Sequence, residues 1–198
     1  MTSPLSEGGR NFLLRLARQA LEDCVLHHPA SREGGSEEEL CAQCGAFVTL
    51  RKAGRLRGCI GHVDTSAPLH QTVQDCAVAA ALRDPRFEPV TADELPELRI
   101  EISVLSGLAD VRPEEVEVGR DGVLISRGSQ SGLLLPQLAS HWNWDREKFL
   151  EETCLKAGLP ADAWCRGARI QAFTAQVFGE PEGPSAPQTP HAVQASRA

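Results

Sequence analysis

Apolar residues recur every three to four positions in three stretches of the chain, residues 12–25, 69–80 and 145–157. This spacing places them along one side of a helix, so each stretch is predicted to form an amphipathic helix. For the middle stretch, Ser66 is expected to cap the helix, with Pro68 in its first turn. The pattern therefore predicts three helices, each with one buried side.

Shorter segments carry the alternation or the residue types of β-strands, and turn residues separate them. These segments are residues 46–50, 55–63, 100–104, 123–126, 133–135 and 169–178. The first two are joined by a basic turn that ends in Gly54, which predicts a β-hairpin. Helices and hairpins interleave without a regular alternation of strand and helix, so the expected fold class is α+β.

Composition and charge then narrow the function classes. The chain has 198 residues, with 20 Lys and Arg against 27 Asp and Glu, and its formal net charge is −7. This charge repels phosphate backbones and anionic membrane surfaces, which argues against nucleic-acid or membrane partners. The apolar runs are shorter than the roughly 18 to 20 residues of a membrane-spanning helix, and residues 1–9 lack the pattern of a signal peptide. A cytoplasmic protein is expected.

The most unusual local sequence is LRGCIGH, residues 56–62. On an ideal strand, Cys59 shares one face with Arg55 and Arg57. Positive charge near a cysteine favours the nucleophilic thiolate, and the flanking glycines let a ligand or another backbone approach closely. Cys59 and Arg57 are therefore candidate catalytic residues. The alternative is a buried cysteine in a tight strand whose glycines only accommodate packing.

A possible metal site combines two residues of this segment, Cys59 and His62, with two earlier cysteines, Cys41 and Cys44. Cys41 and Cys44 are separated by two residues, as are Cys59 and His62, a spacing that resembles a zinc knuckle. Cys59 and His62 are three apart in a strand and would point to opposite faces unless a turn intervenes. Incidental spacing is the favoured interpretation, and a redox-active cysteine pair is the remaining alternative. No cofactor is predicted, zinc included.

The segment RDPRF, residues 83–87, places charged and aromatic residues at the predicted end of the middle helix. One interpretation is an ion-paired stop signal with Phe87 folded back into the core. The other is a site in which Asp84 and Arg86 grip an anion or a carboxylate near Cys59. The sequence leaves both open.

Several strings occur in an order and at a spacing that resemble the AMMECR domain family, whose bacterial and archaeal members are called AmmeMemoRadiSam system protein A. The strings are GAFVTL at 45–50, LRGCIGH at 56–62, AAALRDPRFEPV at 79–90, ELPELRIEISVLSGL at 94–108, LLLPQLA at 133–139 and FLEETCLKAGLPADAW at 149–164. The resemblance covers residues 8–180. The remaining segment, residues 181–198, is rich in Pro, Ser and Ala and is predicted to be a disordered tail.

The resemblance implies a single two-lobed α+β domain, with antiparallel or mixed sheets, flanking helices and a cleft between the lobes near the LRGCIG segment. The positions expected at this cleft are Gly58, Gly61, His62, Asp84, Arg86 and Phe87. It also implies two partners from the same system, a Memo-like protein and a radical S-adenosylmethionine protein.

Two functions remain open from the sequence. The favoured one is a non-catalytic adaptor that binds a partner or a small molecule near the LRGCIG segment. The alternative is a thiol-dependent enzyme or enzyme subunit, with Cys59 as nucleophile or carrier and Arg57 supporting the thiolate. The enzyme hypothesis lacks a general base for the thiol. His62 is the nearby candidate, but the alternation of side chains along a strand points it away from the face of Cys59.

Overall fold

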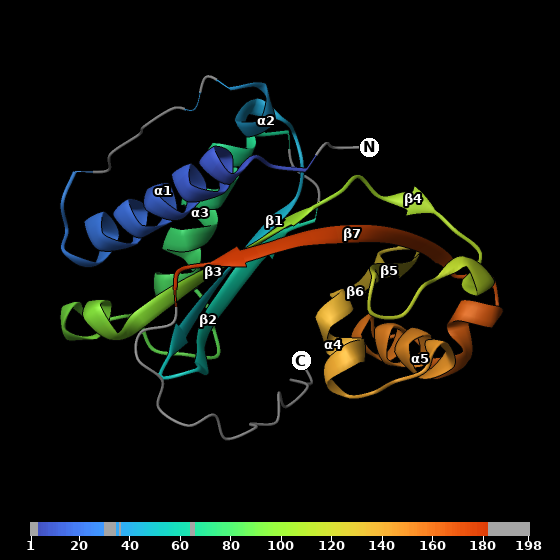
Figure 1. The fold of residues 1–198 in the computed structure, drawn as a ribbon. Coiled ribbons are helices and arrows are strands. Elements are labelled where there is room, and N and C mark those ends of the chain that lie inside the picture. The colour runs from blue at the N-terminus through green and yellow to red at the C-terminus, as the bar shows by residue number, and fades with distance from the viewer. Residues whose placement is uncertain (1–3, 30–34, 36, 64–65, 182–198) are drawn as a thin grey trace. The chain divides into compact units, whose positions relative to one another are not determined.

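The computed structural model describes residues 4–29, 35, 37–63 and 66–181, which form two compact units (Figure 1). The first unit holds the chain up to Leu105 and the stretch that begins at Gln176, and the second holds Ser106–Ala175. The fold class is α+β, as predicted. The predicted tail, 181–198, lies outside the described residues apart from Pro181, and the cleft stays a prediction.

Helix α1, Glu7–Val25, opens the first unit and confirms the first predicted helix. Its cap is Ser6, whose hydroxyl accepts a hydrogen bond from the backbone N–H of Gly9 at 2.9 Å. The short helix α2, Glu38–Cys41, supplies Glu39, whose carboxylate accepts bonds from both the N–H and the hydroxyl of Ser6. The capped end of α1 is thus tied to α2.

Helix α3, Leu69–Leu82, confirms the middle predicted helix but begins differently. Pro68 occupies the cap position itself, with extended backbone angles, and no side chain caps the helix. The predicted cap at Ser66 is therefore wrong. Because the fixed φ of proline suits the residue that leads into a helix, Pro68 marks the start without a hydroxyl cap.

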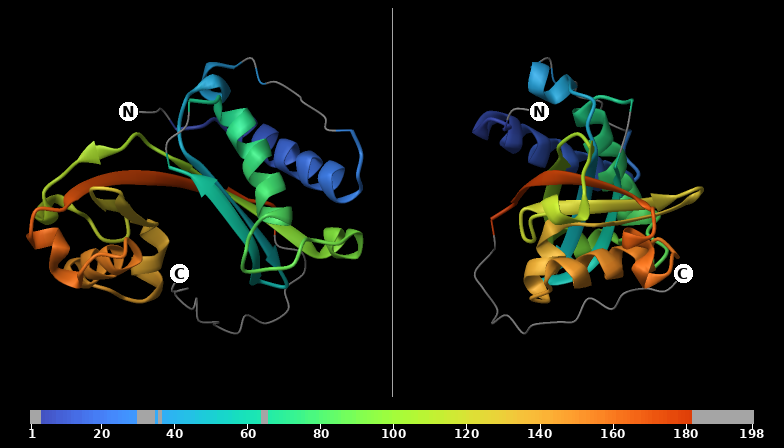
Figure 2. Two further views of the ribbon diagram at one scale, coloured as in Figure 1. Left: turned by 180° about the vertical axis from the view of Figure 1, so that it is seen from behind. Right: turned by 90° about the vertical axis from the view of Figure 1, so that its right-hand side faces the viewer.

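Three strands form the sheet of the first unit: β1, Ala46–Lys52; β2, Arg55–His62; and β3, Leu98–Leu105. Their order is β2-β1-β3, so β2 lies at the edge. Ala53 and Gly54, with φ of 49° and 75°, make the two-residue turn of the predicted hairpin. Helices α1 and α3 cover one face of this sheet (Figures 1 and 2), and the core of the unit lies between the two helices and the sheet.

The second unit is built on three further strands: β5, Asp121–Arg127; β6, Gln130–Leu134; and β7, Arg169–Gly179. Strand β5 pairs with β6 on one side and β7 on the other. Helix α5, Arg146–Lys156, confirms the last predicted helix and packs on β5 and β6. Its cap is Asp145, whose carboxylate accepts the N–H of Lys148 at 2.8 Å. The last residues of β7 belong to the first unit, where Glu180 follows them beside Ile100.

The shorter elements complete the chain. Strand β4, Ala109–Asp110, pairs with β7, and helix α4, Pro136–His141, follows β6. Three 3-10 turns are η1, Ala92–Glu97; η2, Pro113–Glu115; and η3, Ala161–Cys165. The sequence pattern did not indicate β4 or α4, since both are too short to show a period. Within the described part of the chain, no helix combines the length and the apolar character needed to cross a bilayer.

Candidate functional site

A β-bulge shapes the strand that carries the LRGCIG segment. Cys59 lies opposite Thr49 on β1, and the register then shifts by one residue, leaving Arg57 without a partner on β1. Beyond this bulge the residues change sides, so Leu56 shares the side of Cys59 and Arg55 does not. The predicted common face of Cys59 and Arg55 is therefore wrong, because the bulge breaks the strict alternation on which it rested.

The guanidinium of Arg57 is held by a carboxylate of η1. Its Nε and Nη2 atoms donate to the two carboxylate oxygens of Glu94, each at 2.9 Å, and Lys52 adds a longer contact of 3.3 Å. Glu94 also accepts a hydrogen bond from the N–H of Thr91, in the capping box that begins η1. The Arg57 guanidinium lowers the pKa of Glu94 to about 2. The charge of Arg57 is thus balanced by Glu94.

Asp84 and Arg86 bind the backbone of Cys59. An Asp84 oxygen accepts the Cys59 N–H at 2.8 Å, and Arg86 Nη2 donates to the Cys59 carbonyl at 3.2 Å. The two side chains also pair with each other at 2.7 and 2.9 Å. Since β2 is an edge strand, these backbone groups face away from β1, and the ion pair takes the place of a neighbouring strand. We call this arrangement the edge clamp.

Charge pairing and burial decide whether Asp84, the acidic residue of the edge clamp, is ionised. Asp84 is buried, with 4% of its surface exposed. Hydrogen bonding to Arg86 lowers the pKa of Asp84 to about 2 and outweighs the opposing effect of burial. Asp84 is therefore a carboxylate whose oxygens are engaged within the chain, rather than a free group that awaits a ligand.

The thiol of Cys59 has two polar neighbours, the hydroxyl of Thr49 and the guanidinium of Arg86. Thr49 Oγ1 donates to the sulfur at 3.3 Å, and both residues lie on the side of the sheet opposite the helices. His62 is exposed and lies opposite Ala46, whose side chain is in the helix-covered core. Within the described residues, no imidazole or carboxylate hydrogen-bonds the Cys59 sulfur. The geometry gives the thiol a donor but no general base.

The two glycines that flank Cys59 are explained by packing. A Cβ on Gly58 would lie 2.2 Å from the carbonyl oxygen of Ala80 in α3. A Cβ on Gly61 would lie 2.3 Å from the ring of Phe47. Both distances are too short for any side chain, so glycine is required at each position for close approach within the chain.

Phe87 lies between two arginines at the rim of the edge clamp. The guanidinium carbons of Arg57 and Arg86 stand 5.9 and 5.5 Å from its ring centroid, within the range of cation–π contacts. The ring is half-buried, and the side chain of Arg86 is 39% exposed. Arg57 Nη1 is buried without a hydrogen-bond partner among the described residues. An aromatic ring flanked by guanidinium groups therefore reaches the surface beside Cys59.

The residues of the zinc-knuckle spacing have separate environments. Cys41 is exposed and its thiol donates to the carbonyl of Gly35 at 3.2 Å, whereas Cys44 is buried in the core. Burial raises the pKa of Cys44, which disfavours the thiolate that a metal needs. Across the described ranges, no three His, Cys, Asp or Glu side chains are grouped as metal ligands would be.

Sequence reasoning named Cys59, Asp84 and Arg86 and missed two of their neighbours. Thr49 lies in an ordinary strand, and only the register brings it to the sulfur. Glu94 lies in η1, and its hydrogen bond to Arg57 joins positions 37 residues apart. No short sequence pattern predicts a contact between positions so far apart.

Comparisons with known proteins agree on one family. The AMMECR1 family model matches residues 14–178. Protein TK0174 from Thermococcus kodakarensis is 44% identical, over 87% of this chain and 92% of its own length, and protein Mbar_A1807 from Methanosarcina barkeri is 41% identical, over 85% and 89%. The crystal structure of the uncharacterized protein PH0010 from Pyrococcus horikoshii has a TM-score of 0.78 at 40% identity, covering 88% of this chain and 93% of that one. The chain belongs to the AMMECR1 family.

Proposed function

We propose that the chain is a non-catalytic binding module that engages a partner protein through the surface formed by Phe87, Arg86 and the strand around Cys59. The observation that carries this proposal is that the charged side chains of the site are paired within the chain and that the thiol has no general base. Arg57 is paired with Glu94, and Asp84 is paired with Arg86 and the Cys59 backbone. An arrangement of paired charges without a base supports recognition better than catalysis.

The exposed part of this surface has the residue types of interface hot spots. Phe87 is a half-buried ring fixed by two arginines, and arginine and aromatic residues are enriched where partners bind tightly. The edge clamp holds the adjoining backbone, so the surface is ordered before a partner arrives. The partners we propose are the Memo-like protein and the radical S-adenosylmethionine protein of the same system. The proposal places the chain in the cytoplasm and includes no cofactor, nucleic acid or membrane.

The test is the affinity of the full chain for each of these two proteins, measured by calorimetry. Phe87→Ala should weaken binding at least tenfold, which corresponds to about 1.4 kcal/mol. Arg83→Met alters an exposed arginine four positions away and should leave the affinity within about twofold, since isolated rim charges contribute little. Cys59→Ser should also bind normally. No binding to either protein, or equal losses in Phe87→Ala and Arg83→Met, would contradict the proposal.

One observation favours the thiol enzyme as a second candidate. The Thr49 hydroxyl donates to the Cys59 sulfur, as a hydrogen-bond donor to a thiolate nucleophile would. Alkylation with iodoacetamide, followed by mass spectrometry, distinguishes the binding module from the thiol enzyme. The binding module predicts that Cys59 reacts more slowly than exposed Cys41, whereas the enzyme predicts a faster reaction that Thr49→Val slows. Cys76 is the internal negative control, because burial raises its pKa to about 12.

A further inference from the structure

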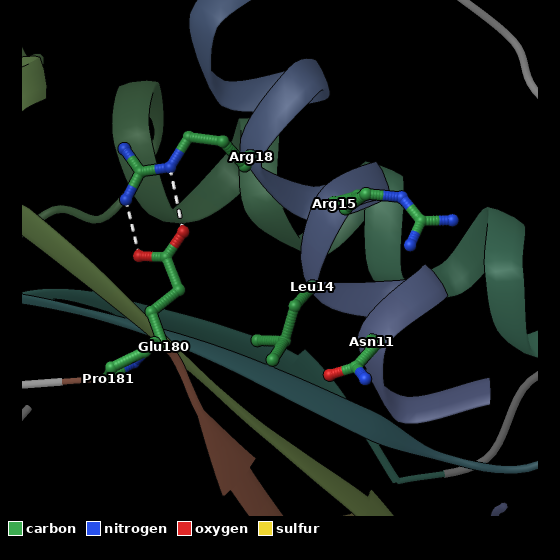
Figure 3. Close-up of a pocket in the computed structure, with 6 residues that line it drawn as sticks. All are labelled: Asn11, Leu14, Arg15, Arg18, Glu180 and Pro181. Carbon is green, nitrogen blue, oxygen red and sulfur yellow. Dashed lines mark hydrogen bonds and ion pairs between the residues drawn. The ribbon is translucent and has the colours of Figure 1, made fainter. Parts of the chain in front are cut away.

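A second, separate feature of the first unit is an open pocket beside α1. It has a volume of about 380 Å³ and is lined by Asn11, Leu14, Arg15, Arg18, Glu180 and Pro181 (Figure 3). This volume is in the range of small-molecule sites. The first four residues lie on one side of α1, and the last two follow β7. The pocket is thus bounded by a helix on one side and the end of a strand on the other.

One wall of the pocket is a closed network of charges. Arg18 pairs with the carboxylate of Glu180 through Nε, at 2.9 Å, and through Nη2. Arg18 also donates to the carbonyls of Leu95 and Leu98, and Glu180 accepts the N–H of Ile100 at 2.9 Å. Both charged side chains of this wall are paired within the chain, so the wall offers no free charge to a ligand.

The opposite side carries the free charge. Arg15 has no hydrogen bond or ion pair among the described residues, and its guanidinium carbon stands 5.7 Å from the ring centroid of Phe12. Figure 3 shows Arg15 extending away from Glu180, with the apolar side chain of Leu14 between them. Leu14 is half-buried and packs on the core, so it forms an apolar floor. Asn11 adds an exposed carboxamide next to Arg15.

We propose that this pocket binds a small aliphatic monocarboxylate. The ligand's hydrocarbon chain covers Leu14 and its carboxylate pairs with Arg15, while the Arg18–Glu180 wall limits its length. The sign of the ligand's charge follows from the charges that line the pocket: the Arg18–Glu180 pair is neutral and the unpaired group, Arg15, is cationic. This inference is independent of the function proposed for the surface around Cys59, because no residue is shared.

The test is titration of the full ¹⁵N-labelled chain with hexanoate and with hexan-1-ol, which has the same carbon chain but no charge. Hexanoate should shift the amides of Asn11, Leu14 and Arg15 to saturation. Because an exposed charge pair contributes modestly, it should bind about two- to fivefold tighter than the alcohol. Arg15→Met should abolish this preference, and Arg10→Met, an exposed arginine on the same helix, should keep it.

Three outcomes would overturn the proposal. One is the absence of saturable shifts at these amides with hexanoate. Another is equal affinity of the native chain for hexanoate and the alcohol. The third is tighter binding of N-acetyl-Leu-Leu than of hexanoate, which would assign the pocket to the carboxyl terminus of a protein chain instead of a small molecule.

Discussion

The two units use charged side chains in different ways. In the first unit, the pairs Arg57–Glu94 and Asp84–Arg86 include side chains that are 15%, 16% and 2% exposed, with only Arg86 at 39%. In the second unit, Arg169–Asp110 and Arg112–Glu115 have side chains between 48% and 77% exposed. Taking charges out of water is costly, whereas exposed pairs contribute little in either direction.

The difference extends to what the pairs connect. Arg57 and Glu94 are 37 residues apart, and Asp84 binds Cys59 across 25 residues. The second unit also has a buried carboxylate, Asp121, but it accepts hydrogen bonds from Arg120 and from the N–H of Glu117, which are its neighbours along the chain. Partly buried charge pairs that join distant segments, Arg18–Glu180 included, are therefore a feature of the first unit. This concentration is why we place the binding function in the first unit.

The largest expected effect comes from breaking the close approach of β2 to α3. In Gly58→Val the new side chain would collide with the backbone of Ala80, and backbone cannot move aside cheaply. We expect the free energy of unfolding, measured in urea, to fall by about 3 kcal/mol or more. Gly107→Val, in the second unit with nothing near its Cβ position, should change it by less than about 0.5 kcal/mol. Similar values for the two variants would remove the close-approach argument.

Removing the partner of Arg57 should come next. Glu94→Ala leaves a largely buried guanidinium without its carboxylate and also removes the capping box, so we expect a loss of about 2 to 3 kcal/mol in the same measurement. Thr91→Ala removes only the hydroxyl of the capping box and should cost about 1 kcal/mol. If both variants lose the same amount, the Arg57–Glu94 pair contributes nothing and the contrast between the units fails.

The edge clamp should appear in the dependence of stability on pH. The pKa of Asp84 is about 2 in the folded chain, below the ordinary value of 3.8, so the unfolded chain binds the proton more readily. Its contribution, about 2 kcal/mol, is therefore fully present above pH 5 and is lost as the pH falls toward 2. Urea unfolding of the native chain and Asp84→Asn at pH 6 and pH 2.5 should show a difference that shrinks with acid. A constant difference would contradict the clamp.

The smallest effect is expected in the second unit. Arg169→Met breaks the exposed pair with Asp110, and solvent screens such pairs, so the urea midpoint should not move measurably. Arg57→Met is the matched change in the first unit and should lower the midpoint clearly. A shift for Arg169→Met as large as that for Arg57→Met would show that the two units do not differ in this respect.

Local patterns predicted the elements well, and tertiary contacts account for what they missed. Apolar spacing is enough to identify α1, α3 and α5, because each buries one long side in a core. The hairpin turn is likewise predicted by the adjacent residues that form it, which end in Gly54. The bulge at Arg57 cannot be predicted in this way, since it is defined only against β1, and it removes Arg55 from the face of Cys59. The edge clamp likewise depends on β2 having no neighbouring strand on its outer side.

The most direct test of the central claim is amide hydrogen exchange of the full chain, alone and mixed with the Memo-like protein or the radical S-adenosylmethionine protein. The account predicts slower exchange in β2, Arg55–His62, and in residues 86–88 with at least one of them, in the native chain and equally in Cys59→Ser. Two results would contradict the assignment of this surface as a non-catalytic binding site. One is protection that is lost in Cys59→Ser, and the other is no protection of these segments with either protein.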